Sequence, residues 1–232
     1  MSSTRFHALI PAAGVGARLG ATLPKQYLPL AGKPMLLHAL QAFVDSPQID
    51  RIHLVVSAAD GYVDEALSAE PELQGRVNVL RCGGETRKAS VLNGLRTIAG
   101  ETRVNDWILV HDAARPGLTP QLVSKLIDAV ADSPVGGLLA LPVVDTLKAA
   151  DANGSAERTV PRAGLWAAQT PQMFRHGLLL RALEAAGEIT DDASAIEALG
   201  LRPLLIEGSP RNFKVTLPHD IALAELYLKG QA

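Results

Sequence analysis

The stretch Ala8-Leu9-Ile10-Pro11-Ala12-Ala13-Gly14-Val15-Gly16-Ala17-Arg18-Leu19-Gly20 begins as a short apolar run and continues as a loop of small residues. The apolar run predicts a buried first strand, and the glycines after it allow backbone N–H groups to approach an anion closely. Arg18 and, further on, Lys25 add cationic side chains. We therefore interpret the segment as a phosphate-binding loop; an ordinary glycine-rich turn between a strand and a helix is the alternative.

Residue spacing excludes two familiar phosphate-binding motifs. A dinucleotide-binding fingerprint requires a glycine three residues after Gly16, where this chain has Leu19, and Pro24 interrupts the region of the following helix. A Walker-type loop requires Ser or Thr after a Gly-Lys pair, but Lys33 is followed by Pro34. What remains is a nucleotide-phosphate loop of another kind, which carries its own arginine and lysine.

Composition favours one globular domain over residues 1–232. Hydrophobic residues make up 47% of the 232, enough for a substantial core, and the net charge of −2 argues against partners such as nucleic acid or a membrane surface. Cys82 is the only cysteine, so no internal disulfide forms, and a reducing, cytoplasmic compartment is expected. No apolar run approaches the roughly 18 residues of a membrane span. A small-molecule ligand is the expected partner.

Apolar runs alternate with segments of helical periodicity along the chain. Beyond the first strand, we predict strands at 52–56, 77–80, 107–110, 137–144 and 203–207, and helices at 35–44, 62–67, 90–98, 119–131, 176–186, 192–199 and 218–228. This alternation implies right-handed crossovers and an α/β fold, with a mostly parallel central sheet and helices on both faces.

The segment from about 143 to 163 differs from the rest, because it is polar and contains the strong turn signal Asp151-Ala152-Asn153-Gly154-Ser155. It predicts a projecting two-stranded β-arm. An isolated two-stranded ribbon is marginally stable in water, so such an arm is expected to pack on a second subunit in a homodimer.

Ligands of parallel α/β sheets bind beyond the carboxyl ends of the strands, so the residues that follow each strand are the candidates for a site. The third strand is followed by residues 82–90, which combine two glycines with Arg87 and Ser90, a set that suits a nucleobase or ribose. The fourth is followed by His111-Asp112-Ala113-Ala114-Arg115-Pro116. Asp112 could hold a divalent cation that contacts phosphates, or could cap a turn. Arg115 is expected to support this loop, and His111 to be a core histidine.

Several short motifs follow one another along the chain. They are Pro11-Ala12-Ala13-Gly14-x-Gly16-x-Arg18, Pro24-Lys25-Gln26-Tyr27, Gly83-Gly84-x-x-Arg87-x-x-Ser90, His111-Asp112-Ala113-Ala114-Arg115-Pro116, Asp145-Thr146, Gly164-Leu165-Trp166, Thr170-Pro171-Gln172, Thr190-Asp191-Asp192-Ala193-Ser194 and Lys214-Val215-Thr216. No single motif decides the matter, but the set spans nearly the whole chain. It resembles the 2-C-methyl-D-erythritol 4-phosphate cytidylyltransferases.

The resemblance implies a Rossmann-like nucleotidyltransferase fold and the transfer of CMP from CTP to methylerythritol phosphate, with release of pyrophosphate, in the non-mevalonate isoprenoid pathway. It implies catalytic roles for Arg18, Lys25 and Lys214, and a contact of Asp112 with Mg²⁺ or another divalent cation. The implied nucleotide-binding residues are Pro11, Ala12, Ala13, Gly14, Gly16, Gly83, Gly84, Arg87, Ser90 and Ala113. The implied binding residues for methylerythritol phosphate are Thr146, Arg162, Thr170, Thr190 and Lys214, with Thr146 and Arg162 reaching the neighbouring subunit from the arm.

Two positions depart from the family pattern. The residue before Arg18 is often basic in the family, whereas this chain has Ala17, which receives no charge role; Glu85 receives no role in cytosine recognition. Two alternatives to the implied function stay open at this point. One is a related cytidylyltransferase that acts on a pentitol phosphate and forms CDP-ribitol, and the other is a nucleotide-binding regulatory protein without catalysis.

Overall fold

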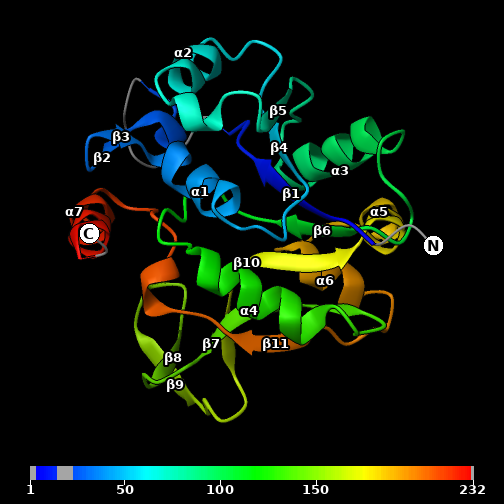
Figure 1. Ribbon diagram of the computed structural model, residues 1–232. Helices are drawn as coiled ribbons and strands as arrows, with labels where there is room; N and C mark the ends of the chain where they lie inside the picture. Colours follow the sequence, from blue (N-terminus) through cyan, green and yellow to red (C-terminus); the bar gives the residue numbers. More distant parts are fainter. Residues whose placement is uncertain (1–3, 15–22, 231–232) are drawn as a thin grey trace.

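A computed structural model describes residues 4–14 and 23–230. Within these residues, one seven-stranded sheet has the strand order β11-β7-β10-β6-β1-β4-β5 (Figure 1). Its strands are β1 (Phe6–Pro11), β4 (Arg51–Val55), β5 (Val77–Leu80), β6 (Trp107–Val110), β7 (Gly136–Pro142), β10 (Trp166–Arg175) and β11 (Leu204–Glu207). Only β10 runs antiparallel to its neighbours, β6 and β7, within this described sheet. The predicted α/β class with a mostly parallel sheet is confirmed.

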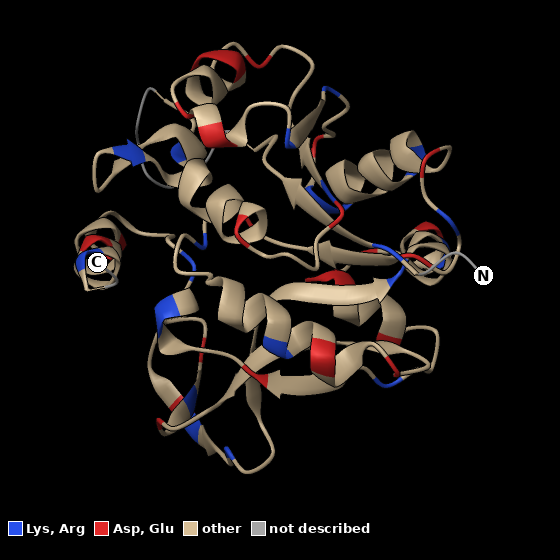
Figure 2. Ribbon diagram, viewed as in Figure 1, with Lys and Arg blue, Asp and Glu red and all other residues tan. Residues whose placement is uncertain are grey.

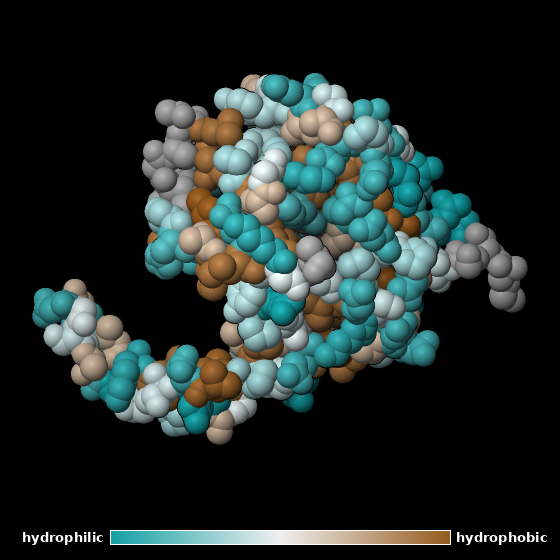
Figure 3. All heavy atoms as spheres, turned by 60° about the vertical axis from the view of Figure 1, so that its left-hand side comes forward, coloured by the Kyte–Doolittle hydropathy of each residue, from teal (hydrophilic) through white to brown (hydrophobic). Residues whose placement is uncertain are grey.

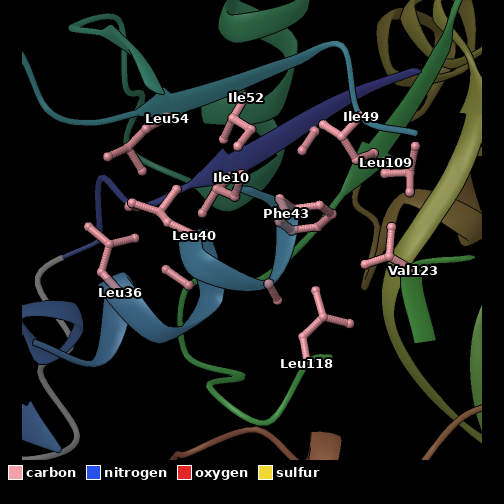
Figure 4. Packing of buried hydrophobic residues seen from close by; sticks show 14 of the residues in the cluster. Ile10, Leu36, Leu40, Phe43, Ile49, Ile52, Leu54, Leu109, Leu118 and Val123 are labelled. Atoms are coloured by element: carbon pink, nitrogen blue, oxygen red, sulfur yellow. The ribbon is translucent and has the colours of Figure 1, made fainter. Parts of the chain in front are cut away.

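Helices cover both faces of the sheet. Successive residues of a strand point to opposite faces, and in the central strands both sets are apolar, so each face packs against helices. On one face, α1 (Met35–Val44) and α4 (Pro120–Val130) pack on alternate residues of the central strands. Figure 4 shows Leu40 and Phe43 of α1 packed toward Ile10 and Ile52. On the other face, α3 (Arg87–Ile98), α5 (His176–Ala185) and α6 (Asp192–Glu197) pack on the intervening residues, such as Leu9.

Smaller elements complete the described fold. They are the helices α2 (Val63–Ser68) and α7 (Pro218–Lys229), the 3-10 turns η2 (Lys25–Tyr27), η3 (Pro71–Leu73) and η4 (Pro210–Asn212), and the short strands β2 (Pro29–Leu30) and β3 (Lys33–Pro34). The helix α7 lies at one side of the molecule (Figure 1) and buries Ala224 in a small cluster with Leu30 and Val215. This packing fixes the segment that contains Lys214 against the body of the protein.

The helix α3 and the strand β10 differ from the prediction. The helix expected at 90–98 begins at Arg87, because Thr86 has an extended backbone and its hydroxyl accepts the Ala89 N–H, which caps the first turn. The strand β10 has no counterpart in the prediction. Pro171 lies within it, and its pairing with β7 shifts register between Ala168 and Gln172, so it lacks the continuous apolar pattern of the other strands.

The predicted arm is confirmed as the antiparallel pair β8 (Leu147–Ala150) and β9 (Ala156–Val160), placed between β7 and β10. It extends from the body of the molecule (Figure 1), and in the space-filling view it forms a narrow projection that borders a hollow (Figure 3). Most of the residues in these two strands are exposed, and none is buried. A projecting element of this kind offers a large surface to a partner.

Charged residues of both signs are interspersed over the described chain (Figure 2). In the ranges 4–14 and 23–230, none of the helices combines the length and the apolar character needed to cross a membrane.

Candidate active site

A first pocket opens beyond the carboxyl ends of β1 and β6. The described residues that line it are Pro11, Ala12, Ala13, Gly14, Lys25, Gln26, Arg87, Ser90, Asp112, Ala113, Ala114 and Lys214. Most of them are small, so the wall of this pocket consists largely of backbone. It therefore unites most of the predicted nucleotide-binding residues, together with the two predicted catalytic lysines.

Close packing of the backbone shapes the floor of this first pocket. The Ala12 N–H donates to the Val55 carbonyl at 2.8 Å, which continues the parallel pairing of β1 and β4. A Cβ atom on Gly83 would lie 2.3 Å from the Ala13 Cβ and 2.8 Å from the Val56 carbonyl oxygen. Only glycine fits at position 83 without displacing the Ala13 segment, so Gly83 supports the pocket from behind.

Side-chain hydrogen bonds fix the turn that contains Lys25. Gln26 is buried, and its side-chain amide donates to the Ala12 carbonyl at 2.7 Å. The Tyr27 hydroxyl donates to Asp60 Oδ2 at 2.9 Å, and its ring packs against Tyr62. Lys25 itself lies in the pocket, with its Nζ 3.5 Å from the Val215 carbonyl oxygen. The turn thus joins the first loop to the segment after η4.

Asp112 is surrounded by cations. Its Oδ1 lies 2.7 Å from Arg87 Nε, and its Oδ2 lies 2.9 Å from Lys214 Nζ and 3.6 Å from Arg115 Nε. Burial alone would raise the pKa of the Asp112 carboxyl, but the Arg87 and Lys214 charges hold that pKa well below its usual range. The carboxylate is therefore ionised and holds the Lys214 ammonium at the pocket.

A directional chain of hydrogen bonds fixes the loop that presents Asp112. The Asp112 N–H donates to Thr170 Oγ1 at 3.1 Å, Thr170 Oγ1 lies 2.9 Å from His111 Nδ1, and His111 Nε2 lies 3.2 Å from the Arg115 carbonyl oxygen. Since a carbonyl only accepts, we assign the ring proton to Nε2, and Nδ1 accepts the Thr170 hydroxyl. Burial lowers the pKa of His111 to about 4, so the ring is neutral at pH 7. The expected core histidine is confirmed.

A second pocket lies on the other side of Arg87, Asp112 and Lys214. The described residues that line it are Arg87, Asp112, Arg115, Ala168, Gln169, Thr170, Gln172, Thr190, Asp191 and Lys214. Polar side chains dominate this wall, and they come mainly from β10 and from the turn before α6. We call the three residues common to both pockets, Arg87, Asp112 and Lys214, the shared trio.

The expected supporting role of Arg115 fits its contacts. Besides its approach to Asp112, its Nη1 donates to the Asn212 carbonyl at 2.9 Å. Asn212 is completely buried, and its amide donates to the Thr170 carbonyl at 2.7 Å. Arg115 therefore joins the loop after β6 to η4 and, through Asn212, to β10.

The remaining predicted site residues fall into three groups. Gly16 and Arg18 lie outside the described residues. Gly84 lies behind the first pocket, where its N–H donates to the Ser90 hydroxyl at 3.1 Å. Thr146 and Arg162 are exposed and belong to the arm region, and Arg162 donates to the Val144 carbonyl. The described residues that line the two pockets do not include these two arm residues.

Residue patterns did not identify the contacts of Gln26, Gln172 and Asp192. Gln172 is buried in β10, donates to Asp191 Oδ2 at 2.8 Å and accepts the Ala193 N–H at 2.7 Å. Asp192 accepts from Arg87 Nη2 at 2.8 Å. The available signal was the polar character of both glutamines beside apolar or aromatic neighbours, which is unusual at buried positions.

The donor set of the first pocket is compatible with one protein ligand for a divalent cation. Asp112 is the acidic residue among its described lining residues, and Oδ1 has one close donor, so a lone pair remains. No group of three or more metal-ligating side chains was found within residues 4–14 and 23–230. Mg²⁺ commonly takes one or two carboxylates and completes its shell with phosphate and water. A cation held chiefly by a bound triphosphate, with Asp112 as its protein ligand, fits this arrangement.

Known proteins share both the sequence and the fold. The family model of 2-C-methyl-D-erythritol 4-phosphate cytidylyltransferase matches residues 6–230. The relative of that name from Nitrosospira multiformis is 54% identical over 97% of this chain and 98% of its own, and the one from Ralstonia nicotianae is 56% identical over 98% and 93%.

Solved structures agree with the sequence relatives. A crystal structure of 4-diphosphocytidyl-2C-methyl-D-erythritol synthase superposes with a TM-score of 0.87, at 43% identity over 98% of this chain and all of its own. The Francisella tularensis 2-C-methyl-D-erythritol 4-phosphate cytidylyltransferase superposes with a TM-score of 0.82, at 33% identity over 97% and 100%. With the family model spanning both pockets, this chain belongs to the 2-C-methyl-D-erythritol 4-phosphate cytidylyltransferase family.

Proposed function

We propose that the protein transfers CMP from CTP to 2-C-methyl-D-erythritol 4-phosphate and releases pyrophosphate, as a step of non-mevalonate isoprenoid biosynthesis. The observation that carries the proposal is the pair of pockets that meet at the shared trio. A two-substrate phosphoryl transfer requires two sites whose reacting groups meet at one place. The first pocket accepts the nucleotide, and the second accepts the methylerythritol phosphate.

The reaction is an in-line displacement at phosphorus. A phosphate-monoester oxygen of methylerythritol phosphate forms a bond to the α-phosphorus of CTP, and the bond to the leaving pyrophosphate breaks. Both reactants are anions, so repulsion between them and the charge that accumulates on the phosphoryl oxygens are the main obstacles. Fixed cations at the boundary of the two pockets reduce the repulsion between the substrates and neutralise part of the charge on the phosphoryl oxygens.

Lys214 and Lys25 are the described cations best placed for this role. Asp112 holds the Lys214 ammonium at 2.9 Å, at the boundary where the transferred phosphoryl group lies between the two substrates. Lys25 reaches the first pocket from the turn that Gln26 and Tyr27 fix. In the same proposal, Arg18 grips the triphosphate from the loop outside the described residues.

Asp112 is the residue that would hold a divalent cation, Mg²⁺ being the expected one. The cation would neutralise triphosphate charge and act as a Lewis acid at the phosphoryl oxygens. Arg87 and Arg115 keep the Asp112 carboxylate oriented toward the pockets.

We further propose a homodimer in which the arm contributes Thr146 and Arg162 to the second pocket of the neighbouring subunit. Both residues are exposed on or beside an element that extends from its own subunit, and Val144 and Trp166 at the base of the arm are exposed apolar residues. A partner subunit would bury this surface and stabilise the two-stranded ribbon. Light scattering at micromolar concentration should give twice the mass of the chain, and a monomer would contradict the proposal.

Subunit complementation tests the shared site directly. In the proposed dimer, each site combines Lys25 of one subunit with Arg162 from the arm of the other. Lys25→Ala or Arg162→Ala alone therefore damages both sites of a dimer, and each variant by itself should be inactive. After unfolding and refolding as an equal mixture, half of the dimers are mixed, and each contains one intact site; roughly a quarter of wild-type activity should return. Activity that stays at the level of the separate variants would show that the arm serves no neighbouring site.

The proposed reaction is tested by pyrophosphate release from CTP, Mg²⁺ and methylerythritol phosphate. Turnover with CTP but not with ATP, GTP or UTP, and with methylerythritol phosphate in preference to ribitol 5-phosphate, is the expected result. Preference for ribitol 5-phosphate would identify a pentitol phosphate cytidylyltransferase instead, and nucleotide binding without pyrophosphate release would identify a regulatory protein. The single cysteine, which forms no internal disulfide, supports a cytoplasmic location for this activity.

A further inference from the structure

The Arg87 guanidinium connects two carboxylates that are distant in sequence. Its Nε donates to Asp112 Oδ1 at 2.7 Å, and its Nη2 donates to Asp192 Oδ2 at 2.8 Å. Arg87 is the first residue of α3, Asp112 follows β6 and Asp192 is the first residue of α6. The arginine therefore holds three separate elements together at the shared trio.

Among the described residues, the contact with Arg87 is what connects the Asp192 side chain to the site. Its exposed fraction is 0%, and it is absent from the described linings of both pockets. Its Oδ1 has no hydrogen-bond partner among the described residues. Burying a carboxylate with an unsatisfied oxygen is costly, and a well-packed apolar residue would be the more stable choice in many proteins. The carboxylate therefore has a role other than packing.

The helix end that contains Asp192 is itself firmly held. Asp191 caps α6 in a capping box with Ser194, and Gln172 of β10 binds both the Asp191 carboxylate and the Ala193 N–H. Asp192 therefore has a fixed place relative to β10, which forms one wall of the second pocket. The Arg87 side chain, which binds Asp192, is therefore also held in a fixed position relative to β10.

We propose that Asp192 is a positioning residue that fixes the Arg87 guanidinium as the boundary between the two pockets. Three cations compete for Asp112, which has only two oxygens. With Asp192 as a second anchor, Arg87 presents only its Nε edge to Asp112 and leaves Oδ2 to Lys214 and Arg115. Without that anchor, Arg87 can turn fully onto Asp112 and displace Lys214, which alters both pockets at once.

The test is Asp192→Asn, and it rests on the proposed cytidyl transfer. The amide keeps the shape of the side chain and an oxygen for Arg87 Nη2, but removes the charge. Loss of one charge-assisted hydrogen bond predicts about a 10-fold decrease in kcat, with KM for CTP and KM for methylerythritol phosphate both changed by about threefold or more. Unchanged kcat and KM values in a folded variant would overturn the proposal.

Glu184→Gln is the matched control. It makes the same kind of carboxylate-to-amide change on the ion pair of Arg96, another arginine of α3, at an exposed position 2.8 Å from Arg96 Nη2. Its kinetic constants should equal those of the wild type, because surface ion pairs contribute little. A comparable kinetic loss in this control would also count against the proposal, since it would show a general sensitivity of α3.

Arg87→Lys supplies the second variant. A lysine has a single ammonium and cannot bind two carboxylates in the planar geometry of a guanidinium, so it should change both KM values as Asp192→Asn does. If Asp192 acts through Arg87, the double variant should lose little more than either single variant, whereas multiplied losses would overturn the proposal. Should Asp192→Asn not fold, Arg87→Lys decides: a change confined to KM for CTP would contradict the shared boundary.

Wild-type turnover in the same assay distinguishes failure of the proposed function from failure of the positioning role. A wild-type enzyme that releases no pyrophosphate refutes the proposed function. An active wild type with an unaffected Asp192→Asn variant refutes only the positioning role.

Discussion

The two pockets meet at the shared trio but are built from different materials. The first pocket lies at the ends of parallel strands and is walled largely by the backbone of small residues such as Ala12 and Ala13. The second lies along the antiparallel strand β10 and is walled by polar side chains such as Thr170 and Gln172. Steric changes should therefore dominate the response of the first pocket to substitution, and the loss of hydrogen bonds should dominate that of the second.

The largest expected effect concerns the cationic side chain of Lys25 in the first pocket. Lys25→Ala should lower kcat by roughly 100- to 1000-fold, as the removal of one donor to a developing oxyanion typically does. Folding should change little, because the turn is held by Gln26 and Tyr27. Pyrophosphate release measures the first quantity and urea unfolding the second.

Lys33→Ala is the control for that measurement. It also removes a lysine, but this one forms an exposed ion pair with Glu70 at 2.7 Å. Turnover should stay at the wild-type level. Near-normal turnover in Lys25→Ala would refute the catalytic assignment.

The next prediction addresses the second pocket through Thr170. Thr170→Val keeps the shape of the side chain but removes the hydroxyl that accepts the Asp112 N–H and binds His111 Nδ1. Two buried polar groups then lose their partner, at a cost of about 1–3 kcal/mol each. Urea unfolding should show this loss, and KM for methylerythritol phosphate should rise.

Thr170→Ser retains the hydroxyl and separates hydrogen bonding from packing. It should restore most of the stability that the valine variant loses. If serine and valine destabilise the protein equally, the chain from Asp112 to His111 does not hold the loop.

The difference between the parallel strands beside the first pocket and the strand β10 beside the second also explains which strands can be predicted from the sequence. The four parallel strands around β1 and the strand β7 are evident as apolar runs, because both faces of the sheet are covered. The strand β10 escapes prediction, since Pro171 lies within it and Gln169 and Gln172 place polar groups at buried positions. Hydrogen bonds that join distant segments satisfy those groups, and local patterns do not show them.

The same reasoning applies to the candidate site. Small residues at strand ends identify most of the first pocket, because close backbone approach requires them. The anchoring of Arg87 by Asp192 links residues 105 positions apart and leaves no signature in local spacing. A resemblance to known motifs identifies the residue types, but only the fold shows that Arg87 is engaged by two carboxylates.

The steric character of the first pocket is tested at Gly83. Gly83→Ala places a methyl group 2.3 Å from the Ala13 Cβ, so the pocket wall must shift, at a cost of about 1–3 kcal/mol. KM for CTP should increase, with KM for methylerythritol phosphate nearly unchanged. Gly61→Ala is the matched control, because a Cβ there meets nothing within 4 Å among the described atoms and Gly61 is absent from the described linings of both pockets. Equal effects of the two substitutions on stability and on KM for CTP would contradict this steric account.

The smallest predicted effect is the pH dependence of the unfolding free energy that two buried histidines cause, one in β4 and one beside β10. Burial lowers the pKa of His53 in β4 and of His111 beside β10 from 6.5 to about 4. Between these values the unfolded chain binds more protons than the folded one, so stability is complete above about pH 6.5 and is lost as pH falls toward 4.

Lowering the pH from 8 to 6 should therefore cost about 1 kcal/mol of unfolding free energy for each of these two histidines. Urea unfolding of His53→Gln at the two pH values should show a loss smaller than that of the wild type by this amount. His219→Gln, which replaces an exposed histidine, is the control and should show the wild-type loss. If His53→Gln shows the same loss as the wild type, the His53 imidazole of the wild type must take up a proton in the folded protein, through its contacts with His7 and Asn78. Of these two histidines, only His111 would then stay unprotonated in the folded state.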